Sequence, residues 1–178
     1  MTKRLAITRS VQAHAHIEAL RASASATLDS LNKNLSHPDP LSALGRLKFE
    51  AIGHDPLDST RKLNLIEQLN QTFTYLAAFR GAEFLFNRHP NVNEPILNLG
   101  NVSGWDIETQ EDNGIAAEVF AAVTPNNNQK LRNDIKKVQS APHRNRYVLF
   151  ICPRHAPGRI SHKLAQDDVQ VWSLGPIQ

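Results

Sequence analysis

The stretch that decides the fold is GIAAEVFAAV, from Gly114 to Val123. Eight of its ten residues are apolar, which is typical of a β-strand buried on both faces of a sheet. Glu118 is the exception, because it places a carboxylate near the middle of the apolar run. An unpaired charge buried there costs several kcal/mol unless a proton, a cation or an ion-pair partner compensates it. The sequence therefore predicts a buried strand whose glutamate has a compensating group.

The composition is that of an ordinary globular chain of 178 residues, 40% hydrophobic and 21% charged. The net charge of +3 permits nucleic-acid binding without demanding it. The single cysteine, Cys152, excludes an internal disulfide and suits a reducing cytoplasm. No run approaches the roughly 18 apolar residues of a membrane span, and the N-terminal segment lacks the apolar region of a secretory signal. We expect a soluble cytoplasmic protein with no membrane partner.

The first half of the chain has helical periodicity, and the second half alternates apolar runs with turn signals. Helical spacing predicts three helices, which span Leu5 to about Leu35, Leu41 to Ile52 and about Ser59 to Asn87. Apolar runs predict five strands, at Ile96–Leu99, Trp105–Thr109, Ile115–Val123, Tyr147–Cys152 and Val169–Leu174. A basic segment between the third and fourth of these strands predicts a helix, at about Asn127–Gln139. This order indicates an α/β fold with an N-terminal helical layer over 1–58 and an α/β core over 59–178, expected to form one compact unit.

Local signals mark the boundaries of these elements. The break HPDP, from His37 to Pro40, separates the first two helices, and Ser59 or Thr60 can serve as the N-cap of the third. Residues at 3.6 spacing form the expected core-facing side of that third helix, namely Ile66, Leu69, Phe73, Leu76, Phe79 (or Arg80) and Phe84.

Asp106 lies on the strand one hairpin upstream of Glu118. Asp112, Asn113 and Gly114 form a strong turn signal, because Asn-Gly supplies the positive φ that a two-residue turn requires. In an antiparallel pair joined by that turn, Asp106 and Glu118 can lie side by side. Two carboxylates in a dry sheet repel each other unless a proton or a cation lies between them. Hard oxygen ligands favour Mg²⁺ or Mn²⁺ as that cation.

Each acidic residue also has a simpler explanation. Asp106 or Glu108, taken alone, could face water at a strand edge. Glu118 could form a structural salt bridge with Arg146 of the neighbouring strand. Glu83, at the edge of the core-facing side of the long helix, could reach the carboxylate pair, or it could pair with Arg80 or Asn87 on its own helix.

The order of helix glutamate, strand aspartate, hairpin and strand glutamate, followed by a helix and two strands, resembles the core of the PD-(D/E)XK nuclease superfamily. The resemblance covers roughly Phe79 to Leu174 and implies a restriction-endonuclease-like mixed sheet flanked by helices. The family's helix glutamate, preceded by a nearby glycine, falls on Glu83 in RGAEF, the aspartate on Asp106 in GWDIE and the strand glutamate on Glu118. The resemblance implies that Asp106, Glu118 and the backbone carbonyl of Val119 bind a catalytic Mg²⁺, which Glu83 supports.

One position departs from the family pattern. Phe120 stands where the family has a lysine that orients the attacking water and stabilises charge at the phosphate. Some members of the superfamily supply this lysine from a neighbouring helix. Lys130 is the first candidate for such a lysine here, and Lys136 is the second.

These features predict a metal-dependent endodeoxyribonuclease of restriction, defence or repair type, needing no small-molecule cofactor. The alternatives are a catalytically impaired nucleic-acid-binding or assembly module on the same fold, and an α/β scaffold in which Glu118 forms a structural ion pair. A basic cluster supplies candidate contacts to the DNA backbone, namely Lys130, Arg132, Lys136, Lys137, Arg144 and Arg146. We expect a homodimer with one site per DNA strand, and the helix from Leu5 to Leu35 as its interface.

Overall fold

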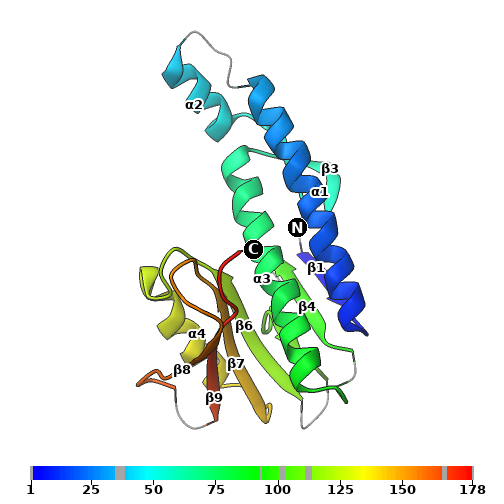
Figure 1. The fold of residues 1–178 in the computed structure, drawn as a ribbon, viewed down its shortest axis with the longest axis vertical. Coiled ribbons are helices and arrows are strands. Elements are labelled where there is room, and N and C mark those ends of the chain that lie inside the picture. The colour runs from blue at the N-terminus through cyan, green and yellow to red at the C-terminus, as the bar shows by residue number, and fades with distance from the viewer. Residues whose placement is uncertain are drawn as a thin grey trace. The chain divides into compact units, whose positions relative to one another are not determined.

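The computed structural model describes residues 2–34, 39–92, 94–100, 103–110, 114–165 and 168–177. Within these ranges the chain is of the α/β class, with four α-helices, a mixed seven-stranded sheet and a second, two-stranded sheet (Figure 1). The helices are α1 (Ser10–Asn34), α2 (Pro40–Phe49), α3 (Leu65–Arg88) and α4 (Lys130–Gln139), the last preceded by a short 3-10 turn, η1 (Asn127–Gln129).

The seven-stranded sheet has the order β1-β4-β5-β6-β7-β9-β8. Its strands are β1 (Thr2–Ala6), β4 (Ile96–Gly100), β5 (Ile107–Glu108), β6 (Ile115–Ala121), β7 (Asn145–Ile151), β9 (Val169–Ser173) and β8 (Gly158–Ile160). Strands β4, β5 and β6 form an antiparallel meander, and β6, β7 and β9 are parallel to one another. Helix α4 connects the parallel strands β6 and β7, as a parallel pair requires.

The chain forms two compact units. Unit 1 contains Met1–His14 and Ala77–Gln178, and unit 2 contains Ala15–Leu76. The division therefore falls inside α1 and α3, whereas the sequence led us to expect a boundary at residue 58. Unit 1 holds the seven-stranded sheet, and unit 2 holds α2 and the two-stranded sheet of β2 (Gly53–Asp55) and β3 (Asp58–Leu63).

The two faces of the large sheet contact different helices. Gly81 of α3 lies so close to one face that an added Cβ would be 3.1 Å from side-chain atoms of both Ile107 and Val119. On the other face, α4 packs against a cluster that includes Phe120 and Phe150. Because side chains alternate along a strand, Glu118 points to the face that α4 covers, and not to the face that α3 covers.

The prediction of a strand buried on both faces is confirmed for β6, which is buried from Ile115 to Phe120. Its neighbour β7 is buried from Tyr147 to Ile151, as the apolar run there also predicted. The parallel register places Glu118 opposite Val148 of β7, in an interior strand of the sheet. Glu118 is 2% exposed, so its negative charge requires a compensating group.

The prediction that helix begins at Leu5 is wrong, because residues 2–6 form the edge strand β1. This strand pairs antiparallel with β4, and Leu5 lies opposite Leu97. Helix α1 begins only at Ser10. The side chain of Gln12, in its first turn, accepts hydrogen bonds from the N–H groups of Thr8 and Arg9, which precede the helix. Pairing with a distant strand outweighs the local helical pattern here.

The predicted start of the third helix is also wrong. Ser59 and Thr60 lie in β3, and α3 begins at Leu65, where Asn64 Oδ1 accepts the N–H of Glu67 at 2.9 Å. Of the predicted core-facing residues, Phe79 is fully buried, whereas three near the start of the helix are exposed, namely Ile66, Leu69 and Phe73.

For two predicted turns, the residues that define the turn lie outside the described residues. These are His37 within HPDP and the pair Asp112-Asn113 of the expected hairpin turn. Among the helices that the structure describes, none is both long enough and apolar enough to cross a bilayer.

Candidate functional site

Asp106 and Glu118 lie side by side in unit 1, although Asp106 sits in the bend that precedes β5 and not on a strand. The N–H of Val119 donates a hydrogen bond of 2.9 Å to Asp106 Oδ2. In return, the N–H of Asp106 donates a long hydrogen bond of 3.4 Å to Glu118 Oε1. Each carboxylate is therefore held by a backbone amide of the other's segment. The adjacency predicted from the hairpin pattern is present in the structure.

Burial and mutual repulsion penalise the charges of this pair. Burial raises the pKa of Asp106, against the effect of the hydrogen bond from Val119. Burial, followed by the charge of Asp106, raises the pKa of Glu118 to about 7, although Lys137 acts in the opposite direction. The pair thus carries less than two full negative charges near neutral pH. A bound cation would reverse this, which is the behaviour expected of a metal-binding carboxylate pair.

Two lysines of α4 approach the pair. Lys137 Nζ lies 2.7 Å from Glu118 Oε1. Lys130 Nζ lies 2.8 Å from Asp134 Oδ1 and 5.8 Å from the centroid of the Phe120 ring. Partial burial acts to lower the pKa of Lys130, but its hydrogen bond to Asp134 and the carboxylates around it raise that pKa overall. Both ammonium groups therefore lie on the side of the sheet to which Glu118 points.

Comparison with known proteins adds nothing to this geometry. Protein-family models, curated proteins and solved structures were each searched, and none of them matches the chain. Function is therefore inferred from the residues of the site.

The two carboxylates fit a hard divalent cation, because they offer oxygen ligands in a buried place where lysine compensates their charges only in part. A third carboxylate, Asp134, lies on α4 and is 4% exposed. Within the described residues, however, no set of three or more His, Cys, Asp and Glu side chains is already arranged as a metal site. The arrangement is thus a carboxylate pair, with Asp134 and two lysines beside it.

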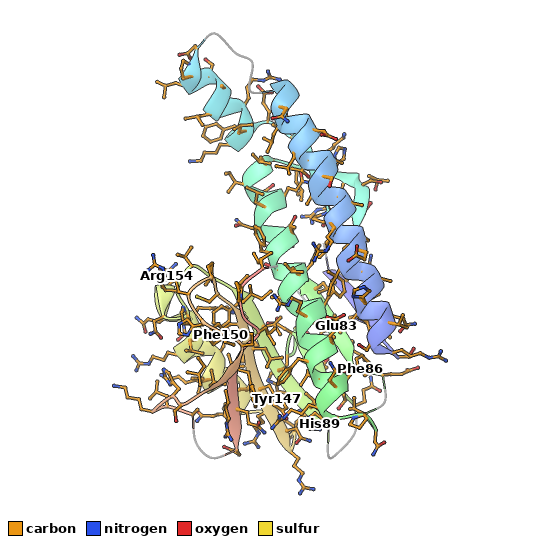
Figure 2. All side chains as sticks on the ribbon, viewed as in Figure 1. Glu83, Phe86, His89, Tyr147, Phe150 and Arg154 are labelled. Atoms are coloured by element: carbon orange, nitrogen blue, oxygen red, sulfur yellow. The ribbon has the colours of Figure 1, made fainter. Side chains whose placement is uncertain are left out.

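The structure does not bring Glu83 to this pair. Glu83 lies on α3 (Figure 2), which packs on the opposite face of the sheet from Glu118, and its Oε1 is 3.5 Å from His14 Nδ1. Its expected support of the metal therefore has no counterpart in the geometry. The close approach of Gly81 to the sheet gives the physical reason, because it fixes α3 on the face that Glu118 does not share.

Among the described residues, neither Arg146 nor Arg80 forms the ion pair that was considered for it. Arg146 pairs with Asp168, and its Nε donates to the carbonyl of His143 at 2.9 Å, so it is not the partner of Glu118. Arg80 donates hydrogen bonds to the carbonyls of Leu174 and Pro176. The ion-pair partner of Glu118 is Lys137, which sequence reasoning had assigned only to DNA contact.

The remaining basic candidates lie away from the pair. Arg132 and Lys136 are exposed; at 100° per residue Lys136 lies opposite the buried residues of α4, and Arg132 lies on the flank away from Lys130 and Lys137. Lys136 therefore does not reach the carboxylate pair. Lys137, and not Lys136, lies where the second candidate for the missing lysine was expected. Arg144 is also exposed, in the segment before β7.

Asp134 was missed by sequence reasoning, and Lys137 was predicted only as a DNA contact and not as the partner of Glu118. Their signal was spacing, because Lys130, Asp134 and Lys137 follow one another at i, i+4 and i+7 and therefore share one side of a helix. Asp134 was also the only acid in the basic segment from Lys130 to Arg159.

A cavity of about 340 Å³ lies elsewhere in unit 1, at the end of α3, and Ile115 and Asn145 line it. Next to it, His89 Nε2 is 2.7 Å from Tyr147 Oη, and burial, followed by the charge of Arg88, lowers the pKa of His89. Tyr147 is fully buried and points to the α3 face of the sheet, so this pair is separate from Asp106 and Glu118.

Proposed function

We propose that this chain is a Mg²⁺- or Mn²⁺-dependent endodeoxyribonuclease of restriction-endonuclease-like fold, acting in restriction, defence or repair. The observation that carries the proposal is the buried pair of Asp106 and Glu118, whose charges are compensated only in part by lysines of the neighbouring helix. The element order supports it as well. Helix α3, the meander β4-β5-β6, helix α4 and the parallel strand β7 follow one another in the order that the family resemblance implies.

In this proposal Asp106 and Glu118 hold the cation, and the backbone carbonyl of Val119 is a further ligand. The chemistry that Mg²⁺ would supply there is a more acidic water as nucleophile and compensation of charge on the scissile phosphate. The protein's task is then to position the phosphate and to stabilise the charge that develops on it.

Lys137 and Lys130 replace the lysine that Phe120 cannot supply. Lys137 has its ammonium 2.7 Å from Glu118, so it is in position to act on a phosphate held at the same carboxylates. Lys130 is held nearby by Asp134. Both are positively charged donors of the kind that stabilise phosphate oxygens in a transition state.

The DNA would lie along the exposed basic residues of α4 and the segment after it. Arg132, Lys136 and Arg144 are exposed and available to phosphates, whereas Arg146 already pairs with Asp168. Contacts of this type position a duplex without reading its sequence.

A second candidate is a catalytically impaired nucleic-acid-binding or assembly module on the same fold. The observation that favours it is the environment of Phe120, which is 5% exposed and stacks on Phe150 with ring centroids 5.6 Å apart. An aromatic wall at this position excludes the strand lysine of the family. In that case the ion pair of Lys137 and Glu118 would serve structure only.

The deciding experiment incubates supercoiled plasmid and genomic DNA with the full chain in Mg²⁺ or Mn²⁺. Asp106→Asn and Glu118→Gln are expected to lower cleavage at least about 100-fold, because the cation contributes several kcal/mol to the transition state. Glu83→Gln is the matched control and should stay within a few-fold of the unaltered chain. Cleavage that survives both site substitutions would contradict the site. DNA binding without cleavage of any substrate would favour the second candidate.

A further inference from the structure

Asp134 is a buried carboxylate on an otherwise basic helix. It is 4% exposed, and only one of its oxygens is used, since Oδ1 accepts the hydrogen bond of 2.8 Å from Lys130. The other oxygen, Oδ2, is buried and has no hydrogen-bond partner among the described residues. A carboxylate oxygen without a partner in such a place is destabilising, because it has lost its hydrogen bonds to water. Buried groups of this kind call for an explanation.

The position of Asp134 on α4 supplies one. Asp134 lies one helical turn before Lys137, whose ammonium contacts Glu118, and one turn after Lys130. The core residues Leu131, Ile135 and Val138 fix this side of the helix against the sheet face to which Glu118 points. Asp134 therefore approaches the Asp106–Glu118 pair from the helix side.

The charges around Asp134 point to the same conclusion. Lys130 Nζ lies 2.8 Å from Asp134 Oδ1, and Lys137 Nζ lies 2.7 Å from Glu118 Oε1. Three carboxylates thus share one buried region with only two lysines. The formal charge of this group is negative, so a divalent cation is the partner that the group lacks.

We infer that Asp134 is the third carboxylate of the cation site, contributed by α4 in the place that the family resemblance gives to Glu83. This inference rests on the proposed metal site of Asp106 and Glu118 and adds a residue to it. Lys130 occupies Oδ1, so Oδ2 is the oxygen that serves the cation or a water molecule bound to it. Among the described residues no three such side chains form a group that could hold a metal ion directly, so Asp134 acts from an outer position through a bound water molecule.

The test measures binding of Mn²⁺ to the full chain by isothermal titration calorimetry, without DNA. Asp134→Asn keeps the size of the side chain and an oxygen for Lys130, and it is expected to weaken Mn²⁺ binding at least about tenfold, as supporting residues of metal sites do. Asp106→Asn should abolish binding. Glu83→Gln should bind Mn²⁺ within twofold of the unaltered chain.

Each outcome separates this inference from the proposed function. Equal Mn²⁺ affinity of Asp134→Asn and the unaltered chain, with binding lost in Asp106→Asn, would overturn the role of Asp134 and leave the carboxylate pair intact. No Mn²⁺ binding by the unaltered chain would overturn the metal site itself, and the inference with it. Thermal melting in EDTA reports whether each variant folds. If Asp134→Asn does not fold, Asp134→Ser in the same titration gives the result.

Discussion

At the scale of single residues, Glu118 combines full burial, a neighbouring carboxylate and a lysine partner. A buried ion pair contributes little net stability, because the cost of removing both charges from water offsets their attraction. The pKa of Glu118 is raised to about 7, first by burial and then by Asp106, in spite of Lys137. The ionised side chain therefore weakens the metal-free fold. Such a cost is common at functional sites and unusual for a core residue.

This cost predicts how stability depends on pH. The folded-state pKa of Glu118 is about 7 against an ordinary value of 4.5, so its contribution to stability is fully present below pH 4.5 and is lost as the pH rises through 7. Glu118→Gln removes this loss, and in EDTA at pH 8 we expect the variant to be more stable by about 2–3 kcal/mol. Urea unfolding at pH 5 and pH 8 measures the difference. A variant that is less stable than the unaltered chain at pH 8 would contradict the assignment of cost to Glu118.

Some residues of the candidate site could be predicted from the sequence, and others could not. Asp106 and Glu118 were predictable because a carboxylate in an apolar run is conspicuous and a strong turn signal lies between them. Glu83 was assigned from the resemblance and from its place at the edge of a helical face. Its actual partner, His14, comes from a distant segment. No local pattern reports which face of a sheet a helix will cover.

At the scale of elements, α4 supplies the lysines that lie beside the carboxylate pair. One side of it packs on the sheet through Leu131, Ile135 and Val138, and Lys130 and Lys137 lie next to that side. The helical period alone groups these lysines. The choice between Lys137 and Lys136 depends on which side of α4 its apolar residues turn toward the sheet, because consecutive residues differ by 100° around the helix axis.

The rotation of α4 predicts unequal effects of its two adjacent lysines. Lys137→Met removes the ammonium beside Glu118, and we expect cleavage of plasmid DNA to fall at least about 100-fold. Lys136→Met changes a lysine on the outer side of the same turn, so only DNA affinity should fall, with a smaller dependence on salt. Single-turnover cleavage with saturating protein separates the two effects. Equal loss of the cleavage rate in both variants would show that charge, and not position, is what matters.

At the scale of the whole molecule, exposed apolar residues are concentrated in unit 2. Leu41 and Leu44 share one side of α2 and are 78% and 60% exposed, and Phe49 at the end of that helix is 76% exposed. On α3, Ile66, Leu69 and Phe73 are also exposed at helical spacing. Exposed apolar surface of this kind often marks a protein interface.

These residues move the expected homodimer interface from α1 to α2 and the first part of α3. A nuclease that cuts both strands of a duplex needs two sites, so the partner we expect is a second copy of the chain. Light scattering after size-exclusion chromatography should give twice the mass of one chain. Leu41→Glu combined with Leu44→Glu should reduce it to the mass of one chain, whereas Val11→Glu on α1 should not. A single-chain mass for the unaltered protein would contradict the dimer.

The parts of the fold that sequence did not predict depend on long-range pairing. The apolar strands β6 and β7 are recognisable alone, because burial on both faces leaves a continuous apolar run. The strands β1 and β3 are short and largely polar, and nothing within them distinguishes a strand from a helix. Their partners decide the outcome, and the partner of β1 is far away in sequence.

That distance has a consequence for how the molecule is made. The register pairs Thr2 with Gly100, and all of unit 2 lies between them in the chain. During synthesis β1 leaves the ribosome well before β4, so it must wait unpaired while about ninety further residues are added, at roughly 5–20 residues per second. The edge of the sheet therefore closes late, after the intervening segment has had time to fold. The polar and charged residues Thr2, Lys3 and Arg4 suit a strand that has to remain in water during this interval.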